Sequence, residues 1–135
     1  MASGYSRSPF RRPCLLLVDD TPANIEVLVG LLKSDFDLKV ATRGAKALEI
    51  CESDLPIDLI LLDVMMPGMD GPGVLAELRK LPNTADTPVI FMTAKVQSSE
   101  VAYFKSLGAL GVIAKPFDPM QLSQQVRDMW EQGTA

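Results

Sequence analysis

The sequence predicts a single α/β domain in which helices cover both faces of a five-stranded parallel sheet. Four continuous apolar runs, CLLLV, LILL, VIFM and GVIA, are typical of strands buried on both faces of such a sheet. Segments with helical periodicity alternate with these runs, as in repeated βα units. Because βαβ crossovers are right-handed, few topologies remain, and we expect the doubly wound strand order 2-1-3-4-5 with five helices.

The first half of the chain predicts two strands and two helices. The first strand is expected over residues 14–19. Thr21 and Pro22 then provide a cap and a proline at the first helical position. A weaker strand at 37–42 is expected at the edge of the sheet, followed by a short helix at 44–53. The apolar stripe of the first helix consists of Ile25, Leu28, Val29 and Leu32.

The middle of the chain continues the alternation. The third strand is expected over 58–63, and the loop VMMPGMDG that follows is rich in turn residues. A helix then runs through Leu78. The fourth strand is expected to begin after Pro88 and to end near Met92.

The last part of the chain predicts a helix at 97–107, which Gly108 closes, and a strand at 110–114. Asp118 and Pro119 are expected to cap the final helix. The apolar stripe of that helix consists of Leu122, Val126, Met129 and Trp130.

Length and composition limit the class of protein. The 135 residues fit one domain, which we expect over 13–131, between a mobile N-terminal arm at 1–12 and a tail at 132–135. A net charge of -4 argues against direct binding of nucleic acid, although the arm carries several arginines. Apolar stretches are too short for a membrane span or a signal-peptide core, so we expect a cytoplasmic protein.

The chain contains no histidine, which excludes Ser-His-Asp and Cys-His catalysis and every histidine-ligated metal site. Cys14 and Cys51 lie far apart in the sequence, and we interpret both as buried, reduced thiols. Any chemistry must therefore depend on carboxylates, lysine, threonine and a hard cation.

Three acids follow the ends of neighbouring predicted strands. Asp19 and Asp20 stand at the end of the first strand, and Asp63 ends the third. The carboxyl ends of parallel strands meet at one edge of the sheet, where ligands bind. Each close pair of carboxylates costs about 1 to 4 kcal/mol at about 4 Å. One of these acids alone would be a helix cap, but a cluster of three predicts a bound Mg²⁺.

Two further groups end the other strands of the sheet. Lys115 follows the last strand, and Thr93 ends the fourth. Each alone is equally consistent with a surface lysine or a strand-forming threonine. Together with a cation and a carboxylate they form the set that phosphoryl transfer requires, with Asp63 as the nucleophile. The pair of Lys115 and Pro116 is also a candidate cis peptide, which would orient the lysine.

The segments LLLVDDTPAN, LILLDVMMPGMDG, VIFMTA and IAKPFD together resemble the response regulator receiver domain of two-component signalling, a flavodoxin-like fold. The resemblance covers about residues 13 to 131. It implies that Asp63 is the phosphoacceptor. It also implies that Asp20, Asp63 and the Met65 carbonyl ligate Mg²⁺, with Asp19 acting mostly through water. Thr93 and Lys115 are implied to bind the phosphoryl group.

The resemblance implies a signalling switch rather than a turnover enzyme. A sensor histidine kinase or a histidine phosphotransfer protein would be the donor, and the chain would catalyse only its own phosphorylation and slow dephosphorylation. The surface formed by the helix at 97–107, the strand at 110–114 and the last helix would change. That change would control a downstream protein, a linked output domain or a phosphorylation-linked homodimer. We expect either a stand-alone regulator or a receiver from a longer protein.

Several positions depart from the family pattern. Val112 occupies a place where many receivers carry Tyr or Phe, so the usual aromatic switch cannot operate in that form. Tyr103 is a candidate substitute, although a half-buried helix residue is the simpler interpretation. Met65 and Lys95 occupy positions that tune phosphoryl lifetime in the family, and we expect them to slow dephosphorylation.

Three other functions compete with this interpretation. A phosphatase of the dehalogenase superfamily would need an acid where Met65 stands. A flavodoxin-like cofactor binder would need a phosphate loop after the first strand, where two acids stand instead. A receiver-like module that binds partners with weak or no phosphorylation remains an alternative because of Val112.

Overall fold

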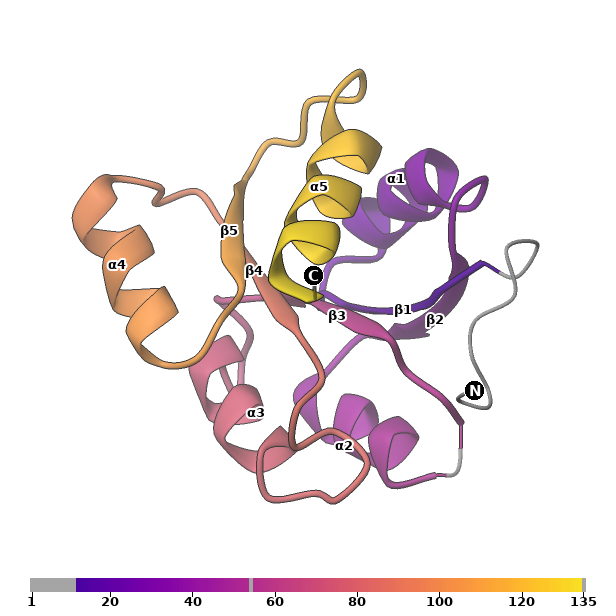
Figure 1. The fold of residues 1–135 in the computed structure, drawn as a ribbon, viewed down its shortest axis with the longest axis vertical. Helices are drawn as coiled ribbons and strands as arrows, with labels where there is room; N and C mark the ends of the chain where they lie inside the picture. Colours follow the sequence, from indigo (N-terminus) through magenta and orange to yellow (C-terminus); the bar gives the residue numbers. More distant parts are fainter. Residues whose placement is uncertain (1–11, 54, 135) are drawn as a thin grey trace.

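The computed structural model describes residues 12–53 and 55–134, in which strands and helices alternate from end to end (Figure 1). The expected mobile arm at 1–12 therefore lies outside the described residues except for Arg12. The element bounds are β1 Cys14–Val18, α1 Pro22–Leu32, β2 Asp37–Ala41, α2 Gly44–Glu52, β3 Leu59–Asp63, α3 Gly71–Leu78, β4 Val89–Thr93, α4 Ser98–Ser106, β5 Gly111–Ala114 and α5 Leu122–Thr134.

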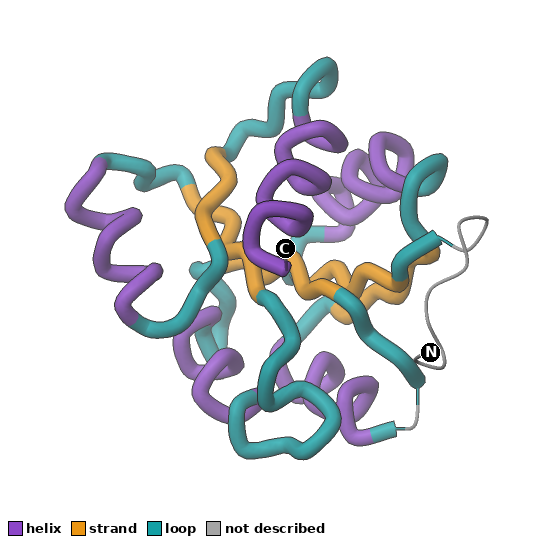
Figure 2. Tube along the Cα trace, viewed as in Figure 1, coloured by secondary structure: helices purple, strands orange, loops and turns teal. Residues whose placement is uncertain are grey.

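The sheet is parallel, and its strand order β2-β1-β3-β4-β5 confirms the predicted topology. Figures 1 and 2 show the helices in two layers. Helices α1 and α5 pack against one face of the sheet, and α2, α3 and α4 pack against the other. This is the doubly wound arrangement, in which the direction of winding reverses between β1 and β3.

The strand interiors explain why the apolar runs are continuous. Successive side chains of a strand point to opposite faces, so a sheet covered on both sides needs apolar residues at every position. In β1, Leu15 and Leu17 contact the α1 and α5 layer, whereas Leu16 and Val18 contact the other layer. All of β1, β3 and β4 is buried.

Local sequence signals set most of the helix ends. Pro22 occupies the first turn of α1, and Thr21 is the N-cap residue but makes no side-chain capping bond. Asp70 caps α3 by accepting a hydrogen bond from the Gly73 N–H at 2.9 Å. Gly108, with a φ of 106°, ends α4 as expected, because this left-handed conformation favours glycine.

The final helix continues further than the sequence predicts. The Asp118 carboxylate accepts a hydrogen bond from the Met120 N–H, and the Asp118 carbonyl accepts one from the Leu122 N–H, so Asp118 caps the turn at 119–121 that leads into α5. Helix α5 begins at Leu122 and continues to Thr134. Residues 132–134, expected as part of a tail, are therefore helical.

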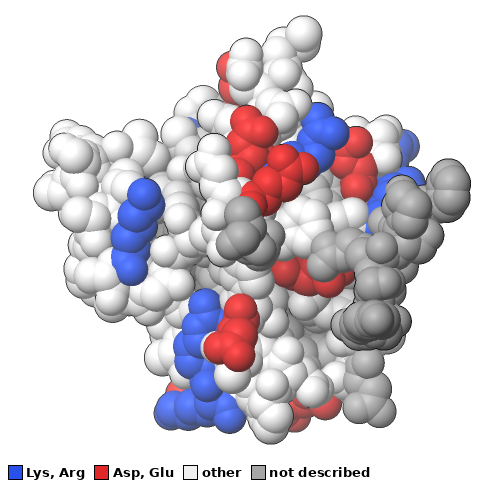
Figure 3. All heavy atoms as spheres, in the orientation of Figure 1, with Lys and Arg blue, Asp and Glu red and all other residues white. Residues whose placement is uncertain are grey.

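Charged side chains of both signs are interleaved on the surface. Figure 3 shows Lys and Arg beside Asp and Glu on the face that carries α5. Ion pairs join Arg12 to Asp37 at 3.2 Å and Lys80 to Glu77 at 3.0 Å. Within the described residues, each helix is too short or too polar to cross a bilayer.

Candidate phosphoryl and metal site

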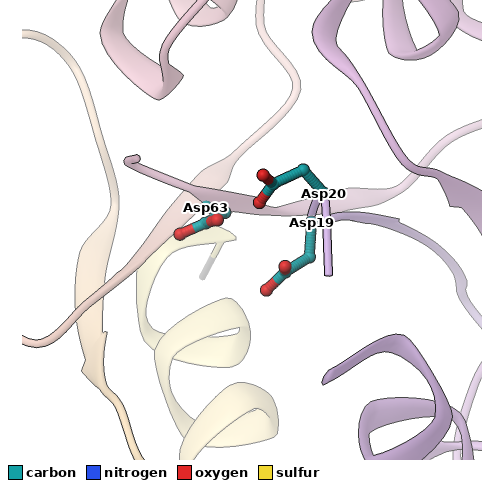
Figure 4. A group of neighbouring side chains, drawn as sticks. All are labelled: Asp19, Asp20 and Asp63. Carbon is teal, nitrogen blue, oxygen red and sulfur yellow. The ribbon is translucent and has the colours of Figure 1, made fainter. Parts of the chain in front are cut away.

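Three carboxylates meet where β1 and β3 end. Asp19 and Asp20 follow β1, and Asp63 is the last residue of β3. The two strands are direct neighbours, with Val18 paired to Leu62, so their ends lie side by side. Oxygen atoms of the three carboxylates lie within 4.8 Å of one another (Figure 4). The predicted acidic cluster therefore exists as one site.

Lys115 links two of these acids. It follows β5, and its Nζ lies 3.0 Å from Asp19 Oδ2 and 2.9 Å from Asp63 Oδ1. Its side chain is 21% exposed, whereas those of the two acids are almost completely buried. The peptide bond from Lys115 to Pro116 is cis, as the sequence suggested. The lysine thus lies in the acidic site and not on the open surface.

The two consecutive acids have different surroundings. Asp19 is fully buried and accepts hydrogen bonds from the Thr21 N–H at 2.9 Å, from the Asn24 amide and from Lys115. Asp20 is partly exposed, and no hydrogen bond joins its carboxylate to another of the described residues. Asp19 is thus held by protein donors, while Asp20 keeps its oxygens available.

The charges of Asp63 and Lys115 are coupled. Burial raises the pKa of the Asp63 carboxyl, hydrogen bonding from Lys115 lowers it, the charge of Asp19 raises it again, and the net direction is upward. For Lys115, burial lowers the pKa, but the hydrogen bonds to Asp63 and Asp19 outweigh this effect and raise it. The ammonium therefore remains charged at neutral pH, and the cluster retains an excess of negative charge.

The residues present fit a hard divalent cation. Carboxylate oxygens are the ligands that Mg²⁺ prefers, and it usually binds to one or two carboxylates while keeping several waters. Asp20 offers a carboxylate to which no other described residue donates a hydrogen bond, and an oxygen of Asp63 lies within 4.8 Å of it. One lysine offsets only part of the charge of three acids, so a cation would relieve the remaining repulsion.

Within the described part of the chain, the Thr93 side chain forms no hydrogen bond to the three acids, but its carbonyl accepts one from the Lys115 N–H at 3.0 Å. Thr93 ends β4, one residue beyond Met92, which pairs with Asp63. Its hydroxyl oxygen accepts a hydrogen bond from the Lys95 N–H at 3.1 Å, which leaves the hydroxyl proton free to donate. The side chain is buried and lines a cavity beside α4.

That cavity has a volume of about 370 Å³ and lies between the β3–α3 loop and α4. Thr93, Tyr103 and Phe104 line it together with Met65. Met65 is 76% exposed, so its side chain stands at the mouth of the site. Lys95 also lines the cavity and is exposed. The two residues expected to influence phosphoryl lifetime thus border the same cavity as Thr93.

The structure shows how Val112 and Tyr103 are packed. Val112 pairs with Phe91 and packs against the layer of α2, α3 and α4, while Thr93 pairs with Ala114. Tyr103 is 55% exposed, and the centroid of its ring lies 5.4 Å from that of the Phe104 ring. Asn24 contacts the site but was missed; its position in the first turn after the acid pair was the available signal.

These features define a class of protein: a doubly wound parallel α/β domain with an acidic, lysine-bridged site at the carboxyl ends of its strands. The chain belongs to the response regulator receiver domain family, whose family model matches residues 15–127. The fold and the place of the site agree with this membership, and the chain is thereby part of two-component, phosphorylation-based signalling.

Comparisons with individual proteins support the assignment. Response regulator PleD of Caulobacter vibrioides is 38% identical over 116 residues, which is 85% of this chain and 25% of PleD. The chain thus spans about a quarter of that relative's length. Chemotaxis response regulator CheY4 of Vibrio cholerae has a TM-score of 0.81 at 25% identity, over 87% of this chain and 98% of that one.

A third relative includes a metal. The receiver domain of sensor histidine kinase PA1611 from Pseudomonas aeruginosa was solved with a magnesium ion coordinated in its active-site cleft. It has a TM-score of 0.77 at 26% identity, over 89% of this chain and 98% of that one.

Proposed function

We propose that the chain is a phosphorylation-dependent switch in which Asp63 accepts a phosphoryl group from a histidine kinase or a histidine phosphotransfer protein. One observation carries this proposal. The ammonium of Lys115 lies 2.9 Å from Asp63 within a cluster of three carboxylates. A lysine and a hard-cation site around one nucleophilic carboxylate provide the electrostatic stabilisation that phosphoryl transfer needs.

In the proposed reaction, an Asp63 carboxylate oxygen forms the new bond to phosphorus. The nitrogen–phosphorus bond of a phosphohistidine breaks, and its electron pair stays on the imidazole nitrogen. Lys115 turns from Asp19 and Asp63 toward the phosphoryl oxygens. The free hydroxyl proton of Thr93 donates to another of these oxygens, because the hydroxyl oxygen is already bonded to the Lys95 N–H.

We propose Asp20, Asp63 and the Met65 carbonyl as the Mg²⁺ ligands, with Asp19 acting mostly through water. The hydrogen bonds that engage Asp19, and their absence at Asp20 among the described residues, support this division. Bound Mg²⁺ would supply positive charge to the phosphoryl oxygens during transfer.

The proposed readout is the surface of α4, β5 and α5. Phe104 is the one fully packed side chain of α4, and cavities lie on both sides of the helix. A helix held in this way can shift when Thr93 and Lys115 change partners. We propose that the changed surface controls a downstream protein, a linked output domain or a second copy of the chain.

The lifetime of the phosphorylated form depends on the residues beside Asp63. We propose that the apolar side chain of Met65 at the mouth of the site and the charge of Lys95 slow its hydrolysis. We also propose that the receiver domain extends over 13–131 and acts in the cytoplasm, and that self-phosphorylation and slow self-dephosphorylation are its only catalysis.

Intact mass after treatment with acetyl phosphate and Mg²⁺ tests the phosphoacceptor. We expect the wild type to gain the mass of one phosphoryl group and Asp63→Asn to gain none. Asp70→Asn is a matched control, because Asp70 is an acid in the adjacent loop whose carboxylate caps α3. Equal labelling of wild type and Asp63→Asn would show that another residue is the acceptor.

A second candidate function follows from Val112. A receiver-like module that binds partners with little phospho-switching is favoured by the absence of an aromatic residue at this position. If the wild type is not labelled, while α4 still binds a partner, this alternative takes the place of the switch.

A further inference from the structure

The Asp19 carboxylate has an additional side-chain donor whose role is unassigned. Asp19 is fully buried, with Oδ1 bonded to the Thr21 N–H at 2.9 Å and Oδ2 bonded to Lys115 at 3.0 Å. The Nδ2 of Asn24 faces both oxygens, at 3.5 Å from Oδ1 and 3.3 Å from Oδ2. Asn24 is therefore in contact with the acidic site without belonging to its charged set.

The position of Asn24 in α1 explains this contact. It is the third residue of the helix, and side chains in a helix lean toward its N-terminus. The amide thus points back toward the residues that precede α1. Both of its distances to Asp19 exceed the usual range of about 2.7 to 3.2 Å for such hydrogen bonds, so the contact is loose while Lys115 occupies Oδ2.

The ammonium of Lys115 cannot keep its full ion pair with Asp19 and also bind a phosphoryl group. The ammonium is shared between Asp19 and Asp63, and a doubly charged phosphoryl group on Asp63 would compete for it. Loss of Lys115 would leave a buried carboxylate without its cation, which is unfavourable unless other donors compensate. Among the described residues, Asn24 is the one other side chain that donates to Asp19.

We propose that Asn24 is a positioning residue that takes over the Asp19 carboxylate when Lys115 turns to the phosphoryl group. Its amide moves closer to Oδ2 as the ammonium leaves, and so keeps Asp19 oriented in the site. The turn of Lys115 rests on the proposed function, but the dependence of Asp19 on Asn24 when the lysine is removed does not.

The first test is a double-mutant cycle without Mg²⁺ or phosphoryl donor. Thermal unfolding in EDTA compares Asn24→Ala in the wild type and in Lys115→Met. We expect Asn24→Ala to lower the Tm by about 3 °C more in Lys115→Met, because there the amide is the remaining side-chain donor to Asp19. The control is Glu26→Ala, an exposed position in the same helix, whose effect should be the same in both backgrounds. Equal effects of Asn24→Ala in the two backgrounds would overturn the proposal.

The second test uses beryllofluoride, a phosphoryl analogue, at saturating Mg²⁺, with binding followed by ¹⁹F NMR. We expect Asn24→Ala to weaken beryllofluoride binding about tenfold, the size of one hydrogen bond to a charged group, and Glu26→Ala to leave it unchanged. If Lys115→Met does not fold, the beryllofluoride measurement alone tests the proposal. An Asn24→Ala protein that binds beryllofluoride as tightly as the wild type would overturn it. If the wild type itself binds no beryllofluoride, the proposed function fails, and the double-mutant cycle still decides the role of Asn24.

Discussion

Helices α1 and α4 both pack against the sheet near the acidic site, but the protein holds them very differently. Leu28 and Leu32 of α1 are completely buried between the sheet and α5. In α4 only Phe104 is buried, and its ring lies 5.1 Å from that of Phe91. Cavities of about 370 and 380 Å³ flank α4. Helix α1, which follows the acid pair, is thus firmly packed. Helix α4, which we propose responds to phosphorylation, has one buried side chain.

The largest effect is expected on the firmly held side. Leu28→Ala should lower the free energy of unfolding by about 3 to 5 kcal/mol, because it removes a fully buried side chain and leaves a cavity. Val101→Ala, at a partly buried position of α4, should lower it by less than about 1 kcal/mol. Urea unfolding measures both, and similar losses at the two positions would remove the contrast between the helices.

Substitution of Phe104, the one buried residue of α4, should have the next largest effect on stability. Phe104→Ala should lower the free energy of unfolding by about 3 kcal/mol, at the low end for such a change, since α4 can detach while the sheet stays intact. Hydrogen exchange should show the amides of α4 losing protection before those of β1 and β3. Uniform loss of protection across the fold would mean that α4 is not a separate unit.

Removal of the Asp63 charge should have a smaller effect on the free energy of unfolding, and this effect should be stabilising. In EDTA, Asp63→Asn should raise the free energy of unfolding by about 1 kcal/mol, because it removes one of three clustered carboxylates. Burial raises the pKa of Asp63 in the folded state, so the wild type binds this proton more tightly when folded. Asp63 therefore costs stability above its folded pKa, and the advantage of Asp63→Asn should shrink as the pH falls toward the unfolded value.

Mg²⁺ provides the control for that prediction. Added Mg²⁺ should raise the Tm of the wild type and should raise the Tm of Asp63→Asn much less. The same shift in both proteins would mean that Asp63 does not contribute to cation binding.

The smallest effect is expected at the exposed aromatic residue of α4. Tyr103→Leu should change the free energy of unfolding by no more than about 0.5 kcal/mol, because the side chain is more than half exposed. If Tyr103 takes part in the readout, Tyr103→Leu should nevertheless alter the exchange of α4 amides on beryllofluoride binding. An unchanged exchange pattern would mean that Tyr103 has no part in the readout.

The strands and the acidic site were predictable because their signals are local and repeated. A buried parallel strand requires apolar residues at every position, and the strand order then brings Asp19, Asp20 and Asp63 together. The strand order alone was sufficient to place the three acids together. The cis peptide before Pro116 and the glycine end of α4 were also local signals.

The features that were missed depend on distances that sequence spacing does not specify. The Asn24 amide lies five residues after Asp19, and sequence spacing alone does not give its distances of 3.3 and 3.5 Å to the carboxylate oxygens. Thr93 lines the cavity beside α4 because the alternation of β4 places it on the same face as Phe91. The cavities beside α4 result from packing over the whole face.

Lys115 has a long reach across the sheet. It follows β5, an edge strand, and its ammonium contacts Asp63 at the end of β3 and Asp19 after β1, which are two and three strands away in the sheet order. Met120 lies five residues after this lysine and is 87% exposed, so a fluorinated probe can be attached there, and we expect its signal to shift when a ligand draws Lys115 away from the acids. Such a shift would report occupancy of the acidic site without a label in the site itself.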